Sequence, residues 1–167
     1  MTNILTKIGM IFAGAILAIA SYGMITATTV DAKGKPGGQT IAAIAASNGN
    51  FDILVKALDE CTGLAPLFDG NRQFTVFAPL DTAFTSIGIT LDSVCETPDL
   101  AKILAYHVTP GVKTSKTVLN RSSMNMLNRQ MAPVDSQNLT IAEKQIVDTD
   151  LRASNGVIHV LSGVMIP

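Results

Sequence analysis

Two short β-prone segments, far apart in the sequence, constrain the fold most strongly. The first, Phe74 to Ala78, is rich in aromatic and β-branched residues and is stopped by Pro79. We expect the carboxylate of Asp81 to cap the helix that directly follows. The second segment starts at Asn155-Gly156, a dipeptide typical of strand-reversing turns, and continues as an apolar strand over 157–161. Both strands are expected to contribute to the core.

Helix signals precede and follow the first strand. Thr40 is expected to cap a short helix over 41–46, and Asn50 to cap a second helix. The second helix has apolar residues at the spacing of one helix face, namely Phe51, Leu54, Val55 and Leu58. Thr97-Pro98-Asp99 predicts a further helix start, and this helix should end near Tyr106-His107.

The chain changes character from Met124 onward. Short β-prone runs separated by polar turns follow one another, at 124–127, 139–142, 145–147 and 157–161. Helices first and strands later predict a mainly β protein of the α+β class, with an antiparallel β-core that carries helices on one side.

The N-terminus has the layout of a secretory signal peptide. Lys7 precedes an apolar run over 8–20 that carries no charge, and small residues follow at export-type spacing. We expect the signal peptide to lie within 1–32, with cleavage after Ala20, Ala27 or Ala32. The alternative is an uncleaved anchor over 8–27, because about 20 apolar residues can span a bilayer.

Either outcome places the remainder of the chain outside the cytoplasm, as a secreted, periplasmic or cell-surface protein. The Gly-, Pro- and Lys-rich stretch 33–39 is typical of a flexible linker, so the domain is expected over 40–167. Only the uncleaved N-terminal segment would contact a membrane.

Cys61 and Cys95 are the two cysteines of the chain. An even number of cysteines in an exported protein predicts a disulfide between them. Closing a loop of about 35 residues would stabilise the fold by roughly 3 to 4 kcal/mol. The alternative is a pair of small buried thiols.

Three segments in this order resemble the fasciclin domain. They are Phe74 to Phe84, Ile103 to Val108 with Pro110-Gly111, and Val147 to Leu151 followed by 153–167. The resemblance covers about 40–167 and implies a wedge of two antiparallel β-sheets with N-terminal and central helices packed alongside. It also implies a role outside the cell in adhesion or matrix association, with a cell-surface or matrix protein or a glycan as partner.

The resemblance also implies a partner-binding site. In vertebrate matrix members of the family, integrin recognition is attributed to the tyrosine-histidine element and to an Asp-Ile pair before the last segment. Tyr106, His107, Asp150 and Leu151 occupy these positions, with leucine in place of isoleucine. His107 also has a structural interpretation, as a buried imidazole that donates to a backbone carbonyl and locks the helix end. We expect His159, on the side of Val157 and Leu161, to be a hydrogen-bonded interior residue.

The sequence lacks the common catalytic motifs. There is no nucleophile elbow, phosphate-binding loop or His-Glu-x-x-His helix, and the two histidines have no nearby cysteine or histidine with which to bind zinc. We therefore predict a protein that is not an enzyme and needs neither cofactor nor metal. A net charge of −1 argues against binding to nucleic acid.

Two further surface features suggest ligands. The stretch 100–134 has no acidic residue, and its cations could meet an anionic glycan or headgroup, chiefly through Lys113, Lys116, Arg121 and Arg129. The alternative is a solvated face balanced by acids elsewhere. Met124, Met126 and Met131 could form an adaptable apolar groove, and the resemblance makes carriage of a carotenoid or lipid the rival function. The alternative for the methionines is packing in the core.

Overall fold

The computed structural model describes residues 38–167, so the expected signal peptide, the alternative anchor and most of the linker lie outside the described residues. Between 38 and 167 no helix combines the length and the apolar character needed to cross a membrane. The helices are α1 (Ile41–Ser47), α2 (Asp52–Lys56), the π-helix η1 (Ala57–Cys61), α3 (Ala65–Asp69), α4 (Asp81–Thr85), the 3₁₀ helix η2 (Val94–Glu96), α5 (Leu100–Tyr106) and α6 (Ser115–Leu119). The strands are β1 (Phe74–Pro79), β2 (Val108–Pro110), β3 (Ser123–Asn125), β4 (Met131–Asp135), β5 (Thr140–Ile141), β6 (Lys144–Ala153) and β7 (Gly156–Leu161).

The strands follow one continuous order, β2-β1-β7-β6-β5-β4-β3, which confirms the α+β class. One pairing differs from the expected antiparallel arrangement. β1 and β7 run parallel, from Phe74 opposite Gly156 to Pro79 opposite Leu161. A parallel pair needs a long crossover, and here the crossover comprises every element between the two strands. Both strands are buried along their whole length, which explains their nearly continuous apolar sequences.

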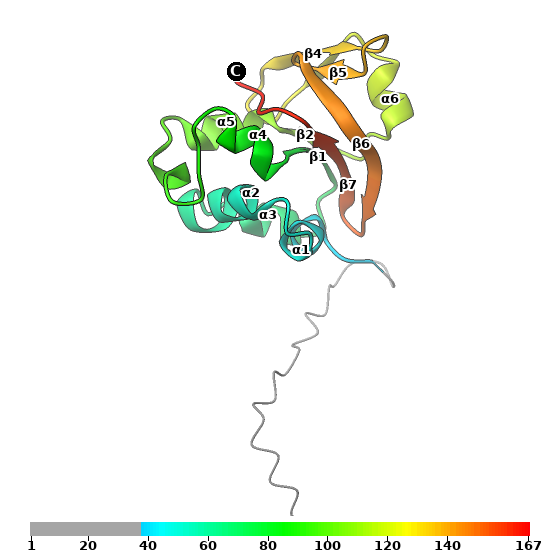
Figure 1. The fold of residues 1–167 in the computed structure, drawn as a ribbon. Coiled ribbons are helices and arrows are strands. Elements are labelled where there is room, and N and C mark those ends of the chain that lie inside the picture. The colour runs from blue at the N-terminus through cyan, green and yellow to red at the C-terminus, as the bar shows by residue number, and fades with distance from the viewer. Residues whose placement is uncertain (1–37) are drawn as a thin grey trace, which may run out of the picture. The chain divides into compact units, whose positions relative to one another are not determined.

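The two faces of the central strands line two separate cores. Val76 of β1 and Ile158 of β7 point into a first core, which they share with the helices α1 to α5. Phe77 and Leu161, on the opposite face, belong to a second core that is enclosed by the other strands and α6. Figure 1 shows α1, α2 and α3 gathered at one end of the domain and β4, β5 and α6 at the other, with β1 and β7 between them.

The sheet curls until its two edges meet. The backbone N–H of Leu127, just after β3, donates to the Val108 carbonyl of β2 over 2.7 Å. The hydroxyl of Thr109 donates to the carbonyl of Asn125 over 2.8 Å. The two expected β-sheets are therefore the two halves of one continuous sheet. This sheet folds around the second core.

The expected caps are partly correct. The hydroxyl of Thr40 caps α1 by accepting from the N–H of Ala43 over 3.2 Å. The expectation for Asp81 is wrong in its target, because the carboxylate accepts from Asp52 N at 3.2 Å and Ile53 N at 2.9 Å and so caps α2. Asn50, expected to cap that helix, instead offers its carbonyl to the N–H of Asp81 at 2.9 Å.

Several boundaries also differ from the expected ones. α5 begins at Leu100, after Asp99 in a left-handed conformation with φ of 54°, and not directly after Thr97. The short helix α3 and the strand β4 had no expected counterpart. The β6 strand is longer than the run 145–147 because its pairing with β7 continues to Ala153, while Lys144 at its start pairs with β5.

Candidate partner-binding surface

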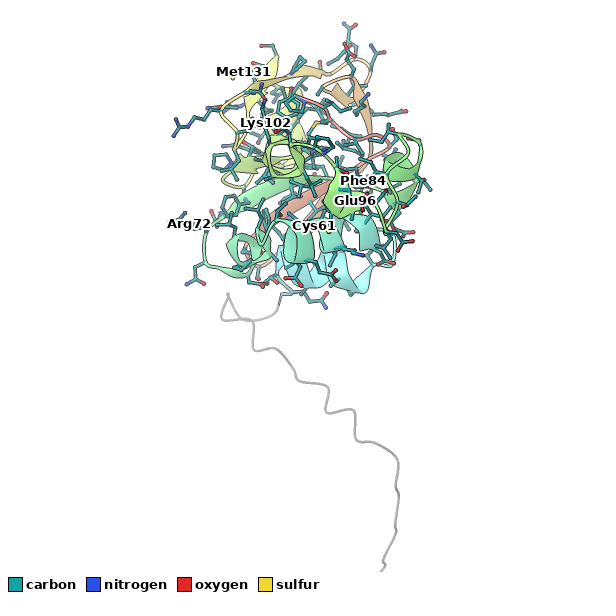
Figure 2. All side chains as sticks on the ribbon, turned by 90° about the vertical axis from the view of Figure 1, so that its left-hand side faces the viewer. Cys61, Arg72, Phe84, Glu96, Lys102 and Met131 are labelled. Atoms are coloured by element: carbon teal, nitrogen blue, oxygen red, sulfur yellow. A yellow bond between two sulfur atoms is a disulfide. The ribbon has the colours of Figure 1, made fainter. Side chains whose placement is uncertain are left out.

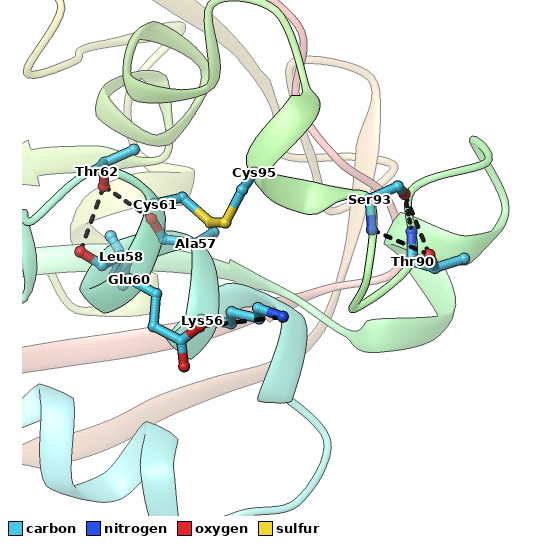
Figure 3. Close-up of a disulfide and its surroundings, with 9 residues drawn as sticks. All are labelled: Lys56, Ala57, Leu58, Glu60, Cys61, Thr62, Thr90, Ser93 and Cys95. Carbon is cyan, nitrogen blue, oxygen red and sulfur yellow. Dashed lines mark hydrogen bonds and ion pairs between the residues drawn. A yellow bond between two sulfur atoms is a disulfide. The ribbon is translucent and has the colours of Figure 1, made fainter.

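The disulfide joins two helical segments that are distant in the sequence. Cys61 at the end of η1 is bonded to Cys95 in η2, with 5.0 Å between the two Cα atoms (Figure 3). Cys61 packs against the first core, whereas Cys95 is exposed. The expected disulfide is therefore present, and the alternative of two buried thiols is not. The hydroxyl of Thr62 donates to the Ala57 carbonyl over 2.8 Å and closes the π-helical turn beside it.

Tyr106 and His107 both lie inside the domain. The Tyr106 side chain is buried at the end of α5, and its hydroxyl donates to the carbonyl of Met131 over 3.2 Å. Burial raises the pKa of this phenol. His107 is 1% exposed. A partner could therefore contact either side chain only if this part of the domain opened.

Both ring nitrogens of His107 take part in internal hydrogen bonds. Nε2 accepts from the backbone N–H of Met165 over 2.9 Å, and Nδ1 lies 2.8 Å from the carbonyl of Ile103. Because Nε2 accepts, Nδ1 must carry the proton that is donated to Ile103. Burial lowers the pKa of His107 to about 4, against the opposing effect of the Ile103 hydrogen bond. The imidazole thus ties the end of α5 to the C-terminal segment.

Asp150 and Leu151 lie at an irregularity of β6. The register against β7 shifts between Asp148 and Leu151, and Asp150 has a φ of 60°. The Asp150 carboxylate accepts from the backbone N–H of Ser115 over 2.9 Å and from its hydroxyl over 2.5 Å. The hydrogen bond from the Ser115 hydroxyl is the main reason why the pKa of Asp150 is lowered. Leu151 is half-buried against the first core.

His159 of β7 also links β6 to the residues that precede α6, from the interior of the domain. It is fully buried, and its Nε2 lies 2.8 Å from the carbonyl of Lys113. Nδ1 accepts from the backbone N–H of Asp150 over 3.3 Å, so the proton resides on Nε2. Burial lowers the pKa of His159, while the Lys113 hydrogen bond and the charge of Asp150 oppose this effect.

The start of α6 and the segment 148–151 therefore meet at one place. Ser115 and Lys113 come from the start of α6, and Asp150 and His159 come from β6 and β7. We call the exposed region above this junction the α6 surface. It consists of residues 112–116 and 147–150, and its exposed side chains include Val112, Lys116, Val147, Asp148 and Thr149. Figure 1 shows α6 beside β6.

Three of the four expected anion-binding cations lie on or next to α6. Lys113 is half-buried before the helix, Lys116 is exposed within it, and Arg121 is exposed after its end. Arg129 is exposed in the turn between β3 and β4, with a φ of 67°. Within 38–167 the one ion pair joins Lys56 and Glu60 over 4.0 Å, so these four cations are unpaired there.

The three methionines separate into two environments. Met124 and Met126 are each 2% exposed and pack within the second core. Met131 is 56% exposed at the surface, where Figure 2 labels it. These side chains do not line a common groove, and two of them have the alternative role of core packing.

Asn155 has a structural role that sequence reasoning missed. It was expected only to form a turn, yet its side chain is buried. Oδ1 accepts from the backbone N–H of Ile41 over 2.9 Å, and Nδ2 donates to the carbonyls of Phe68 and Gly70. Asn155 thereby joins α1, the end of α3 and the β6–β7 turn. The Asn-Gly dipeptide was the only signal for this position.

In the described part of the chain, no three His, Cys, Asp or Glu side chains lie close enough to hold a metal ion. Both imidazoles use both nitrogens in hydrogen bonds within the domain. The two histidines, which were the candidate metal-binding or catalytic residues of the sequence, therefore serve to join secondary-structure elements.

Comparison with known proteins agrees with this architecture. The Fasciclin domain family matches residues 49–167. The uncharacterized protein sll1735 of Synechocystis is 32% identical over 129 residues, which cover 75% of this chain and 96% of that protein. The transforming growth factor-beta-induced protein ig-h3 of Sus scrofa is 28% identical over 150 residues, which cover 87% of this chain but 22% of ig-h3.

A solved structure shows the same fold. The FAS1 domain pair from the insect cell adhesion molecule Fasciclin I matches with a TM-score of 0.62 and 15% identity. The match covers 77% of this chain and 51% of that one. The expected fasciclin-type fold is confirmed.

Proposed function

Because the chain belongs to the fasciclin domain family, we propose that it is an exported, non-enzymatic adhesion module that associates with a cell-surface or matrix protein or glycan. The domain pair of similar fold comes from a cell adhesion molecule, and this is consistent with such a role. The observation on which the proposal depends is the junction of Ser115 and Asp150, which joins the start of α6 to the family segment 147–151 in one exposed surface.

The absence of an enzymatic role is supported by how the reactive side chains are used. His107 and His159 are neutral near pH 7, because burial lowers both pKa values, and each ring already makes two hydrogen bonds. Neither ring has a nitrogen left to accept a proton from a substrate. Asp81 and Asp150 each accept two hydrogen bonds near the start of a helix.

The α6 surface suits recognition because it is both held in place and exposed. His159 and Asp150 hydrogen-bond to the backbone of 113–115 from the interior of the domain. The exposed side chains of this segment therefore lose little conformational entropy when a partner binds. Lys116 and Arg121 extend into solvent from α6 and its end. Their charge complements a partner with sulfate, carboxylate or phosphate groups, of which an anionic glycan is our first choice.

The test is retention of the purified exported chain on a sulfated-polysaccharide column under a salt gradient. We expect Lys116→Glu and Arg121→Glu to elute at lower salt than the wild type, because each reverses an exposed positive charge, on the α6 surface for Lys116 and next to it for Arg121. Arg72→Glu is the matched control, since Arg72 is an exposed cation before β1, as Figure 2 shows. Retention that salt does not weaken, or an equal loss in the control, would reject the electrostatic contact.

The rival function, carriage of a carotenoid or lipid, is not supported by the methionines because Met124 and Met126 fill the second core. Affinity capture from the native envelope or medium, followed by mass spectrometry of proteins, glycans and small molecules, separates the two functions. Recovery of a stoichiometric pigment or lipid without a macromolecular partner would favour the rival.

A further inference from the structure

The helical half of the domain contains an apolar cavity of about 190 Å³ between α1, α2, α3 and the sheet. Its walls include buried side chains from each of these elements, among them Ile41, Phe51, Leu54, Phe68 and Ile158. The cavity lies in the first core, at a distance in the fold from the α6 surface, which adjoins the second core.

The cavity exists because its walls combine large and very small side chains. α1 contributes only the methyl groups of Ala42, Ala45 and Ala46 beside Ile41, and α3 contributes Ala65. Protein interiors are ordinarily close-packed, with few voids larger than a water molecule. A volume of about 190 Å³ is therefore a specific feature of this core.

The cavity opens to solvent, so its volume limits the part of a ligand that it can enclose. An apolar cavity of about 150 Å³ is large enough to hold benzene, whereas sites for drug-sized ligands begin at about 300 Å³. This cavity fits one six-membered ring with one or two additional heavy atoms. A carotenoid or a long acyl chain would leave most of its length outside the cavity.

The charged residues of the cavity wall favour a ligand with a positive charge. Its lining contains two carboxylates, Asp59 of η1 and Asp69 of α3, and no lysine, arginine or histidine. Both aspartates are exposed, so they lie where the cavity wall reaches solvent. Asp69 is held by the hydroxyl of Thr40, which donates to its Oδ1 over 3.3 Å.

We propose that this cavity binds a small one-ring amine in its protonated form, with the ring inside and the ammonium group at Asp59 and Asp69. The apolar walls supply the burial of the ring, and the carboxylates favour a cation over a neutral or anionic analogue. This site is separate from the proposed adhesion surface and would add a small-molecule ligand to the function of the domain.

Three ligands with the same ring test the proposal: benzylamine, toluene and benzoate. Each is titrated at pH 7 into the purified ¹⁵N-labelled exported chain, and binding is followed by amide chemical shifts in α1 and α2. We expect saturable shifts at Ala45 and Leu54 with benzylamine, weaker binding of toluene and the weakest binding of benzoate. Added salt should weaken the binding of benzylamine and leave that of toluene unchanged.

The carboxylates are tested by isosteric substitution. Asp59→Asn and Asp69→Asn should each weaken benzylamine binding about two- to fivefold, the size expected of an exposed charge pair, and should not affect toluene. Asp52→Asn is the control, since Asp52 is an exposed aspartate of α2 outside the cavity lining. Ala45→Leu should fill the cavity and remove the binding of both benzylamine and toluene, with the amide spectrum reporting that the variant is folded.

The proposal is overturned if benzylamine causes no saturable shift at the cavity, if benzoate binds as tightly as benzylamine, or if the Asp52→Asn control loses as much affinity as the other two variants. None of these results bears on retention by the polysaccharide column. Failure of this site and failure of the adhesion proposal can therefore be told apart.

Discussion

His107 should make the stability of the domain depend on pH between about 6.5 and 4. Its pKa falls from the ordinary value of 6.5 to about 4 because the charged imidazole loses its hydration on burial. The unfolded chain therefore binds more protons than the folded domain in this range, and the free energy of unfolding decreases as the pH is lowered. At about 1.4 kcal/mol per pKa unit, the total loss by pH 4 is roughly 3 kcal/mol.

The measurement is urea unfolding of the wild type and of His107→Gln at several pH values from 7.5 to 4. Glutamine can still donate to Ile103 and accept from Met165 but does not titrate, so the variant should lose the contribution of His107 and keep that of His159, whose pKa is also lowered by burial. His159→Gln is the matched control, because it removes the other buried imidazole and should leave the contribution of His107 in place. The lowered pKa values of Asp135 and Asp150 reduce stability only once their carboxyls begin to protonate in the unfolded chain, from about pH 5 downward, so they do not explain a slope between pH 6.5 and 5.

A second variant separates titration from hydrogen bonding. His107→Leu leaves the buried N–H of Met165 without its acceptor, which should cost about 1 to 3 kcal/mol at pH 7.5. The wild type and this variant should then approach one another in stability as the pH falls towards 4. A wild type whose unfolding free energy is constant from pH 6.5 to 4.5, or a His107→Gln variant with the full slope, would refute the reasoning.

Three other substitutions test the supports of the fold. Replacing Cys61 and Cys95 with alanine should lower the unfolding free energy by roughly 3 to 4 kcal/mol, measured by urea denaturation, because the loop they close is long; equal stability of the oxidised and the double-alanine proteins would contradict this. Gly156→Ala should prevent stable folding, since a Cβ there would lie 2.0 Å from the Phe74 carbonyl oxygen, whereas Gly70→Ala, with its nearest atom at 3.9 Å, should be tolerated in the same thermal melts. Asp81→Ala should cost about 1 to 2 kcal/mol, with lost amide protection at the start of α2 and not of α4.

The sequence predicts features that depend on neighbours along the chain. The cap at Thr40, the strand expected over 74–78 and the family segments are all local patterns, and the structure contains each of them, with the strand extended to Pro79. The target of Asp81 could not be predicted in this way, because the two amides that it caps lie 29 and 28 residues earlier. The local pattern indicated an N-cap but not which helix would receive it.

In the candidate site, too, the local segments could be predicted from the sequence, but the contacts between distant residues could not. The family resemblance indicated Tyr106, His107, Asp150 and Leu151. An interior position was among the expectations for His107 and His159, whereas the burial of Tyr106 was not expected. The junction depends on contacts between Ser115 and Asp150, 35 residues apart, and between Lys113 and His159, 46 residues apart. The cavity depends on the packing of three helices against a strand pair, which no periodicity in the sequence describes.

The parallel pairing of β1 and β7 has a mechanical consequence for a module that is pulled by its ends. The start of the domain is attached beside the start of β7, where Ser154 N donates to Gln39 O over 2.9 Å and Asn155 holds Ile41. The C-terminal segment leaves from the opposite end of the same strand, after Leu161. Tension between residues 40 and 161 is thus directed along β7 and loads its backbone ladders to β1 and β6 in shear. In single-molecule pulling we expect these ladders to rupture together at high force, because no end of either ladder can be peeled away first.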